Sequence, residues 1–383
     1  MVPEKKGKFQ NRLRQVRLSK GVSQGEIAAK SGITRQAVSA IESDIYLPST
    51  AVALQLASVL HCRVEDLFSL VEPDEVIEGS VVGALADQTS TVPARVKVAT
   101  IGRNTIVRSV TEIGELLSYT IPADGYLIGT MTQGASIKAR VRLSRERKAI
   151  EQDISVAGCD PAIFLAGEHL RRQKDHGSVI GWTMGSMAAL RALERGEVHV
   201  AGIHLVDPTS GESNLPFLKR RLKGKAYDVV TFAVWEEGFL VRPGNPKGIR
   251  EAADLVDVTV INREEGSGAR LLLDERLRVA RIEAGRIRGY NTIVRSHFDV
   301  ARSIAGNQAD VGIGIRSAAR LFGLDFVSLQ SARYDLVVPK VYLTSHPTLS
   351  HLFETLATRP FRTEIEALGG YDTRETGTIH SLS

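Results

Sequence analysis

Cysteine is scarce in this sequence, and long apolar runs are absent. Cys62 and Cys159 are the only cysteines among 383 residues, and they lie far apart in the chain. This excludes a disulfide-rich scaffold and fits a reducing compartment. No run of about eighteen apolar residues is present, so no transmembrane helix is expected. The basic N-terminus is not followed by an apolar core, so a secretory signal is not expected either. These absences predict a cytoplasmic protein without membrane contacts.

The composition is that of a folded protein with more than one domain. Hydrophobic residues make up 43% and charged residues 24% of the chain, which is typical of soluble globular proteins. At about 150 residues per domain, the length predicts two or three domains.

Positive charge is concentrated near the N-terminus. Residues 1–70 hold ten Lys/Arg and six Asp/Glu, a net +4 of the +5 carried by the whole chain. A basic head on a nearly neutral body predicts a polyanionic partner. Charge alone leaves a second interpretation open, in which the head is a solvated basic tail.

Residues 9–70 have the pattern of five short helices. An apolar stripe of Phe9, Leu13 and Val16 predicts the first helix. Ser23 and Glu26 form a capping-box pattern for the second. Three more helices are expected, from Thr34 to about Ser43, after Ser49, and at residues 64–68.

The segment SQGEIAAKSGITRQAVSAIES fits a helix-turn-helix, with Gly32 in the turn. The predicted seam between its two helices consists of Ile27, Ile33, Val38 and Ile41. Residues 9–70 resemble the Cro-type, or xenobiotic-response-element-type, helix-turn-helix family. The alternative is a small helical bundle that does not bind DNA.

This resemblance implies a double-stranded DNA operator as partner, with the helix that starts near Thr34 in the major groove. Arg and Gln side chains suit direct readout of guanine and adenine. The residues that the resemblance implies as DNA-binding are Gln24 (to phosphate), Thr34, Arg35, Gln36 and Ser39. Arg12, Arg14 and Arg17 are expected to add affinity that does not depend on base sequence. A homodimer is expected from the habit of the family.

Two segments separate this head from the rest of the chain. Residues 71–93 lack periodicity and contain Pro73, Gly79, Gly83 and Pro93, so we expect a linker with at most a short ordered stretch. Residues 94–150 alternate like strands around turn signals. They predict a small β-rich module whose role is a spacer or a dimerisation element.

Residues 151–377 repeat the order strand, glycine-rich turn, helix. This order predicts α/β layers with mostly parallel strands, and a ligand beyond the carboxyl ends of those strands. Helix N-termini offer unpaired NH groups to an anion. The candidate ligand-binding residues at such turns are Cys159, Asp160, Gly185, Ser186, Ser267, Gly268, Ser296 and His297, to which we add Arg270 and Tyr334.

Most of these residue types also suit a structural role. Ser186 and Ser267 are also suited to helix capping, Arg270 to a surface ion pair, and Tyr334 to the core. His204 and Asp207 lack a third ligand, so no metal site is expected, and no cofactor. Cys159 has no base adjacent in sequence, so a buried thiol is expected rather than a nucleophile.

The order of motifs in residues 153–375 resembles a known domain. The motifs include GCDPA, DPTSGESN, NREEGSGARLLLDERL and ADVGIGI. They resemble the substrate-binding-protein-like domain related to periplasmic molybdate-binding proteins, which prokaryotic regulators carry fused to helix-turn-helix modules. The resemblance implies two α/β lobes that close over a ligand, joined by crossing strands at Trp235–Pro243 and Tyr334–Val338. Asp160 is at odds with a bare oxyanion, because its carboxylate would repel one.

The expected fold is therefore multidomain: an all-α helix-turn-helix head, a small β-rich middle segment, and an α/β two-lobed body like type II periplasmic binding proteins. The expected function is a ligand-responsive transcription regulator that senses a small molecule, with oxyanions such as molybdate or tungstate as one class. The alternatives are an enzyme with a self-regulating DNA-binding head, and a DNA-binding protein whose body is an interaction scaffold. We find no convincing nucleophile–base pair, so no enzyme is expected.

Overall fold

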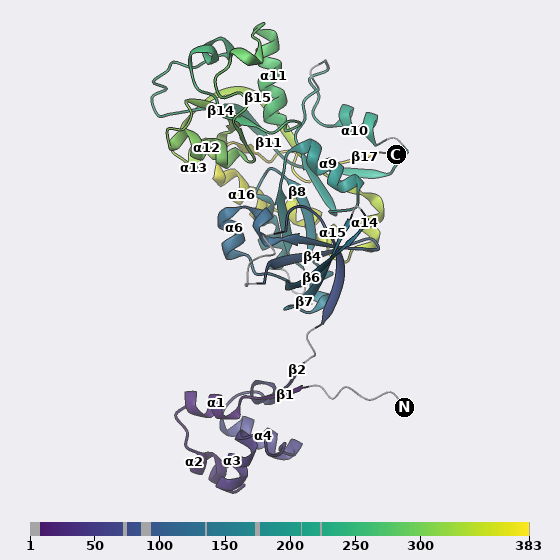
Figure 1. The fold of residues 1–383 in the computed structure, drawn as a ribbon, viewed down its shortest axis with the longest axis vertical. Coiled ribbons are helices and arrows are strands. Elements are labelled where there is room, and N and C mark those ends of the chain that lie inside the picture. The colour runs from purple at the N-terminus through teal and green to yellow at the C-terminus, as the bar shows by residue number, and fades with distance from the viewer. Residues whose placement is uncertain are drawn as a thin grey trace. The chain divides into compact units, whose positions relative to one another are not determined.

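The computed structural model describes residues 8–71, 75–85, 93–134, 136–172, 177–207, 209–222 and 224–382. The chain forms two compact units, Met1–Glu75 and Val76–Ser383, and each is considered by itself (Figure 1). Among the described residues, none of the helices combines the length and the apolar character needed to span a membrane.

The N-terminal unit is the predicted bundle of five helices. They are α1 (Leu13–Ser19), α2 (Gln24–Lys30), α3 (Arg35–Glu42), α4 (Thr50–Val59) and α5 (Val64–Leu67). The core between them contains Leu13, Ile27, Val38, Ile41 and Leu56.

The prediction that the first helix includes Phe9 is wrong. Lys8–Asn11 is strand β1, which pairs antiparallel with β2 (Phe68–Val71) and adds a two-stranded sheet to the helical head. The side-chain oxygen of Asn11 accepts a hydrogen bond of 3.0 Å from the backbone NH of Leu13. This local bond satisfies a free NH of the first turn, so the helix begins at Leu13.

The β-rich segment is a closed barrel with the strand order β3-β5-β4-β6-β7. Its strands are β3 (Val76–Val81), β4 (Arg95–Ile101), β5 (Asn104–Ser109), β6 (Gly125–Gln133) and β7 (Ser136–Leu143). Between β5 and β6 lie the 3-10 turn η1 (Val110–Ile113) and α6 (Glu115–Thr120), and α7 (Arg147–Ile150) follows β7. The barrel therefore begins inside the segment predicted as a linker, of which residues 72–74 and 86–92 lie outside the described residues.

The body is built on an eight-stranded sheet with the order β14-β11-β15-β10-β8-β9, and β16 and β17 pair with β11. Strands β8, β9 and β10 are parallel to one another. The strands are β8 (Ile154–Gly158), β9 (Val179–Thr183), β10 (Val200–Ile203), β11 (Tyr227–Val241), β14 (Val311–Ile315), β15 (Asp325–Pro339), β16 (Tyr371–Asp372) and β17 (Ile379–Leu382).

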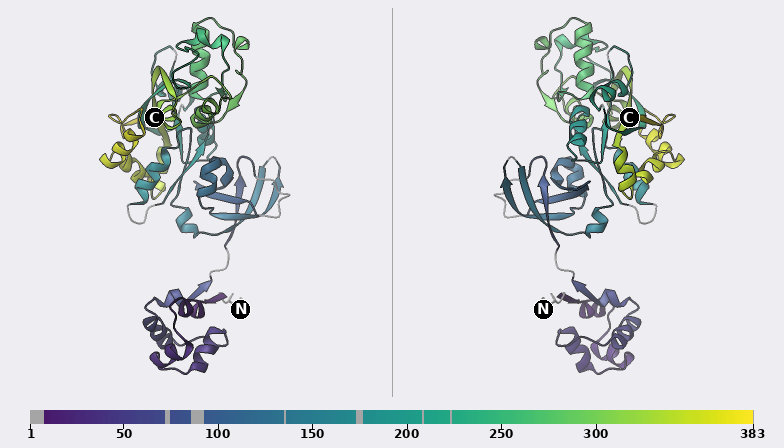
Figure 2. Two further views of the ribbon diagram at one scale, coloured as in Figure 1. Left: turned by 90° about the vertical axis from the view of Figure 1, so that its left-hand side faces the viewer. Right: turned by 90° about the vertical axis from the view of Figure 1, so that its right-hand side faces the viewer.

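Two lobes share this sheet, and β11 and β15 run through both. The first lobe contains β8–β10, α8 (Ile163–Arg171), α9 (Ser186–Glu194) and α10 (Leu215–Arg221). C-terminal helices α14 (Lys340–Ser345), α15 (Leu349–Leu356) and α16 (Arg359–Leu368) follow β15, and α15 and α16 pack on α8. The second lobe, green in Figures 1 and 2, contains β14, the parallel pair β12 (Asn262–Arg263) and β13 (Ile293–Val294), η2 (Ala252–Asp257), α11 (Gly268–Val279), η3 (Ala284–Arg286), α12 (His297–Ala305) and α13 (Arg316–Leu321).

The crossing strands confirm the predicted two-lobed arrangement. β11 and β15 are 15 residues long each and pair antiparallel from Tyr227↔Pro339 to Val241↔Asp325. The segments predicted to cross, around Trp235 and Tyr334, lie in the middle of this pair.

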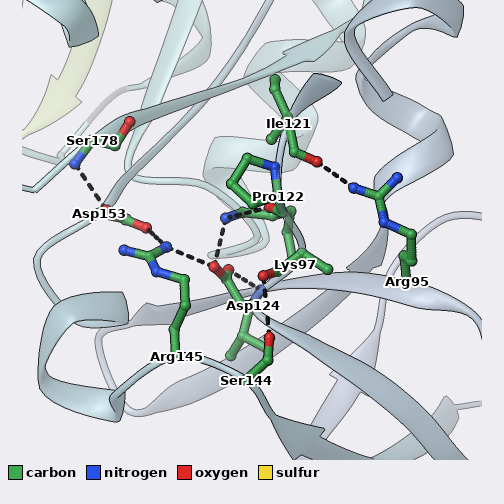
Figure 3. Close-up of polar contacts among 11 residues, drawn as sticks. Arg95, Lys97, Ile121, Pro122, Asp124, Ser144, Arg145, Asp153 and Ser178 are labelled. Carbon is green, nitrogen blue, oxygen red and sulfur yellow. Dashed lines mark hydrogen bonds and ion pairs between the residues drawn. The ribbon is translucent and has the colours of Figure 1, made fainter. Parts of the chain in front are cut away.

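Buried charges fasten the barrel to the first lobe (Figure 3). Arg145 donates hydrogen bonds of 2.6 Å to Asp124 at the start of β6 and to Asp153 before β8. Lys97 of β4 forms a second ion pair with Asp124, at 2.5 Å. Burial disfavours the Arg145 charge, but Asp153 and Asp124 outweigh it and raise the pKa of the guanidinium.

Candidate DNA-reading helix and interlobe site

Helix α3 presents a polar face to solvent and an apolar face to the core. Thr34 caps the helix, with its Oγ1 accepting a hydrogen bond of 3.1 Å from the NH of Ala37. The predicted readout residues Thr34, Arg35, Gln36 and Ser39 are all exposed. Val38 and Ile41 are fully buried on the opposite side. Arg35, Gln36 and Ser39 therefore lie on the exposed face of the helix, whereas the Thr34 hydroxyl serves as its cap.

Gln24 and Arg17 are held by one carboxylate. Gln24 is half-buried, and its Nε2 donates to Glu42 Oε2 at 2.9 Å. Arg17 is 6% exposed and donates from Nε and Nη2 to the two oxygens of Glu42. Burial tends to raise the pKa of Glu42, but the bonds from Arg17 and Gln24 lower it below its ordinary value. The expectation that Arg17 adds affinity independent of base sequence is therefore wrong, because its guanidinium is buried against Glu42.

A second polar cluster lies where the lobes meet, and we call it the interlobe site. Cys159 follows β8 and His204 follows β10, so both come from carboxyl ends of first-lobe strands. The other members come from the crossing strands and the second lobe. They are Trp235 and Glu237 on β11, Tyr334 on β15, Arg263 at the end of β12 and His297 at the start of α12. Each of the seven is 3% exposed or less.

His204 is at the centre of the interlobe site. Its Nδ1 lies 2.9 Å from Glu237 Oε1, and its ring centroid lies 5.5 Å from that of His297. The ligand atoms of Cys159, His204 and His297 all lie within 4.8 Å of one another.

The surroundings shift the pKa values of the two imidazoles in opposite directions. Burial alone would lower the pKa of His204, but Cys159 and Glu237 outweigh it and raise the pKa to about 10. Burial holds the pKa of His297 well below its ordinary value, and the nearby charges of Arg263 and His204 lower it further.

Tyr334 belongs to both the core and the site. Its ring stacks on Trp235 at 4.7 Å between centroids. A β-carbon at Gly158 or Gly202 would lie 2.1 or 1.9 Å from its hydroxyl oxygen, so these two glycines make room for it. A pocket at the carboxyl ends of β8 and β9 is lined by Gly158, Asp160, Thr183 and Tyr334, among others.

Asp160 faces the start of α8 rather than the centre of the interlobe site. Its Oδ1 accepts from the NH of Ala162 at 2.9 Å, and the Tyr371 hydroxyl donates to the carboxylate at 3.1 Å. Burial raises the pKa of Asp160 to about 6. These bonds use the carboxylate in a local cap.

The hydroxyl groups of the serines predicted to bind a ligand form hydrogen bonds within the protein. Ser267 and Ser296 cap α11 and α12, with their oxygens accepting from the NH groups of Arg270 and Asp299. Ser186 is the first residue of α9, behind the N-cap Gly185, and its Oγ accepts from the NH of His204 at 3.0 Å.

Arg270 lies outside the interlobe site. Its Nε donates to Asp274 at 3.0 Å, and its guanidinium lies 4.1 Å from the centroid of the Tyr290 ring. Asp207 likewise accepts from Thr209, Ser210 and Arg220 and does not join His204.

The lobes are in direct contact at this site. A β-carbon at Gly268, the first residue of α11, would lie 2.5 Å from His204 Nδ1. The NH of Met187 on α9 donates to the carbonyl of Gly266 at 3.2 Å, which joins first lobe to second. The structure therefore shows the two lobes closed on each other.

Sequence reasoning missed four members of the interlobe site: His204, Trp235, Glu237 and Arg263. Glu237 carried a usable signal, because it is a charged residue within a segment that was expected to cross between lobes. Several buried polar atoms of this cluster have no hydrogen-bond partner among the described residues. They are Trp235 Nε1, Glu237 Oε1, Arg263 Nη1, the Tyr334 hydroxyl and both ring nitrogens of His204 and of His297.

Similarity to known families agrees with this architecture. Residues 13–67 match a helix-turn-helix model, and residues 167–357 match a PBP superfamily domain. The uncharacterized protein YvgK of Bacillus subtilis is 32% identical over 229 residues, which cover 59% of this chain and 73% of that protein. The uncharacterized HTH-type transcriptional regulator YgzD of the same species is 36% identical over 64 residues, 17% of this chain and 97% of that protein.

Among solved structures, an ABC-type phosphate transport receptor from Vibrio cholerae superposes with a TM-score of 0.40 at 14% identity. The match covers 57% of this chain and 98% of the receptor. The family matches point to a regulator with a binding-protein fold rather than to an enzyme. The chain belongs to the Cro-type helix-turn-helix regulators, and its body is a PBP superfamily domain with a periplasmic-binding-protein-like fold.

Proposed function

We propose that the protein is a ligand-responsive transcription regulator that works in the cytoplasm as a homodimer. Helix α3 reads a duplex operator through Arg35 and Gln36, and Thr34, Ser39 and Gln24 position the helix on the backbone. The observation that carries the proposal is the division of α3 into an exposed polar face and a buried seam.

The interlobe site is the proposed ligand site. It lies at carboxyl ends of strands, as ligands do in α/β folds, and it contains buried polar atoms that have no partner in the described part of the chain. A ligand that binds the closed lobes better than the open ones shifts the balance between them. A change from 1:99 to 99:1 requires a difference of about 5.5 kcal/mol in binding free energy. In a dimer, that change would alter the spacing of two heads on half-sites about 34 Å apart.

An oxyanion such as molybdate or tungstate is one ligand class. Arg263 Nη1 favours it, since this buried donor has no partner among the described residues. Glu237 disfavours it, because a buried carboxylate repels an anion, and the hydroxyls of Ser186, Ser267 and Ser296 already serve the fold.

The DNA-binding half of the proposal is tested with the full chain and duplexes selected from a random pool. Arg35→Ala is expected to cost about 1–3 kcal/mol of binding free energy and to relax the preference at one base pair. Arg63→Ala, which removes the same charge from an exposed residue outside α3, is the matched control and should keep the preference. Identical selected sequences for wild type, Arg35→Ala and Gln36→Ala would refute base readout by α3.

The ligand half is tested by thermal shift with molybdate, tungstate, sulfate, phosphate and organic acids. A ligand at a hundredfold excess over its Kd should stabilise the full chain by about 2.7 kcal/mol. Turnover of a ligand would support the enzyme alternative. If none of these compounds, and none of the metal ions considered below, raised the thermal stability, the scaffold alternative would be supported.

A further inference from the structure

Three metal-binding side chains converge in the interlobe site. The ligand atoms of Cys159, His204 and His297 lie within 4.8 Å of one another, and all three residues are buried. Ligand atoms of a tetrahedral zinc site are roughly 3.4–3.6 Å apart, given bonds of about 2.3 Å to sulfur and 2.0–2.1 Å to nitrogen. A movement of about 1 Å would therefore bring these three ligands to three corners of a tetrahedron.

Glu237 lies within ion-pair distance of one of these ligands. Its Oε1 lies 2.9 Å from His204 Nδ1, and His204 Nε2 has no hydrogen-bond partner among the described residues. Histidines that bind metals commonly donate their other ring NH to a carboxylate, which fixes the tautomer and the ring plane. Metal binding at Nε2 would leave the contact with Glu237 in place.

His297 faces this centre with both ring nitrogens unpartnered among the described residues and with 0% exposure. Buried polar groups are nearly always hydrogen-bonded or bound to an ion, because leaving them unpaired is costly. A metal–nitrogen bond would satisfy one of the two ring atoms.

The charges around the centre suit a divalent cation. Metal binding displaces the protons of its Cys and His ligands, so the Cys159 thiolate and the Glu237 carboxylate would together supply two negative charges. The nearby Arg263 is already paired, since its Nε and Nη2 donate to Glu264 at 2.8 and 2.9 Å. Thiolate and imidazole ligands select zinc-like and copper-like ions over Mg²⁺ and Ca²⁺.

We propose that Cys159, His204 and His297 bind one thiophilic transition-metal ion of the zinc class between the lobes. Glu237 is the positioning residue for His204, and a fourth position is left for water or a small ligand. Two ligands come from the first lobe and one from the second, so the ion would hold the lobes closed. This inference rests on the proposed function in taking the interlobe site as the ligand site.

Metal-free full chain titrated with Zn²⁺ against a chromophoric chelator should bind one equivalent per chain. The same chain loaded with Co²⁺ should show a thiolate-to-cobalt charge-transfer band in the near ultraviolet. Cys159→Ser should lose this band, whereas the matched control Cys62→Ser, in the head, should keep it. His297→Gln should weaken Zn²⁺ binding at least tenfold, and Glu237→Gln by about 10–100-fold with the cobalt band retained.

The outcomes separate this inference from the proposed function. The inference would be overturned if the wild type bound less than one Zn²⁺ per chain. It would also be overturned if the cobalt band survived Cys159→Ser and was lost in Cys62→Ser. The wild-type titration decides even if a variant fails to fold. If an oxyanion stabilises the chain while Zn²⁺ does not bind, the inference fails and the proposed function stands. If Zn²⁺ binds as expected but leaves DNA affinity unchanged, the metal site stands and its proposed regulatory role fails.

Discussion

A β-carbon at Gly268 would lie 2.5 Å from Nδ1 of His204, closer than real side chains approach one another. Gly268 begins the first helix of the second lobe, and His204 follows a strand of the first. The absence of a side chain at position 268 therefore lets the lobes close on the interlobe site.

Gly268→Ala should force the lobes apart. Alanine is about 1 kcal/mol better than glycine inside a helix, so any loss of closure comes from the contact and not from helix propensity. We expect faster amide hydrogen exchange at Met187, whose NH donates to Gly266 across the lobes. The control is Gly285→Ala in η3, where an added β-carbon meets nothing within 4 Å. Equal exchange in both variants would contradict the closed contact.

Removal of Arg145 should destabilise the body. Arg145→Met leaves Asp124 and Asp153, both nearly inaccessible, without a shared partner. Breaking a buried pair costs about 3–5 kcal/mol, and we expect the lower end because Lys97 still pairs with Asp124. Urea unfolding followed by tryptophan fluorescence reports on this unit alone, since Trp182 and Trp235 are the only tryptophans.

The control for that change is Arg147→Met. Arg147 is half exposed and pairs with Glu151 four residues on, and such surface pairs contribute about 0.3–0.5 kcal/mol. Similar midpoints for the two variants would show that Arg145 does not fasten the barrel.

Acid should weaken the junction of barrel and first lobe through His199. The His199 Nδ1 accepts from the NH of Ser155, so Nε2 carries the hydrogen and donates to Thr100 of the barrel. Burial, with His346 beside it, lowers the pKa of His199 to about 3. The unfolded chain therefore takes up this proton below about pH 6.5 and the folded chain does not. Stability should fall between pH 6.5 and 3, by about 2 kcal/mol at pH 5.

His199→Gln should reduce this loss of stability between pH 7 and 5. Part of the loss should remain, because the pKa of His346 is also lowered, by burial, despite the nearby Asp153. His351→Gln, on a half-exposed position of α15, should keep the wild-type pH dependence. An unchanged slope in His199→Gln would assign the acid sensitivity to other groups.

The helix caps of the head could be predicted because they depend on residues close together in the sequence. Contacts between residues far apart in the chain could not be predicted in this way. The capping box of Ser23 and Glu26 and the cap at Thr34 depend on neighbours within three residues, and the structure confirms both. Arg17 was misjudged because its partner Glu42 is 25 residues away. A charge pattern does not show which arginine lies inside.

The interlobe site shows the same limit. Cys159 and His297 were predicted from their turns, but the sequence does not show that they meet His204. Their meeting depends on the register of β11 against β15, which also brings in Trp235 and Glu237. Strand β3 was missed for a similar reason. It has only six residues, and its Gly79 and acidic neighbour are typical of a linker. Its pairing with the other barrel strands cannot be seen in the sequence.

The most direct test of the account measures operator binding by the full chain when lobe closure is impaired. The affinities of wild type, Gly268→Ala and Gly285→Ala for a duplex selected with the wild type would be compared by fluorescence anisotropy. Coupling between sites is typically worth about 5–150-fold in affinity, so we expect Gly268→Ala to differ from wild type by at least about fivefold and Gly285→Ala to match it. Equal affinities for all three proteins would contradict control of the DNA-binding head by the lobes.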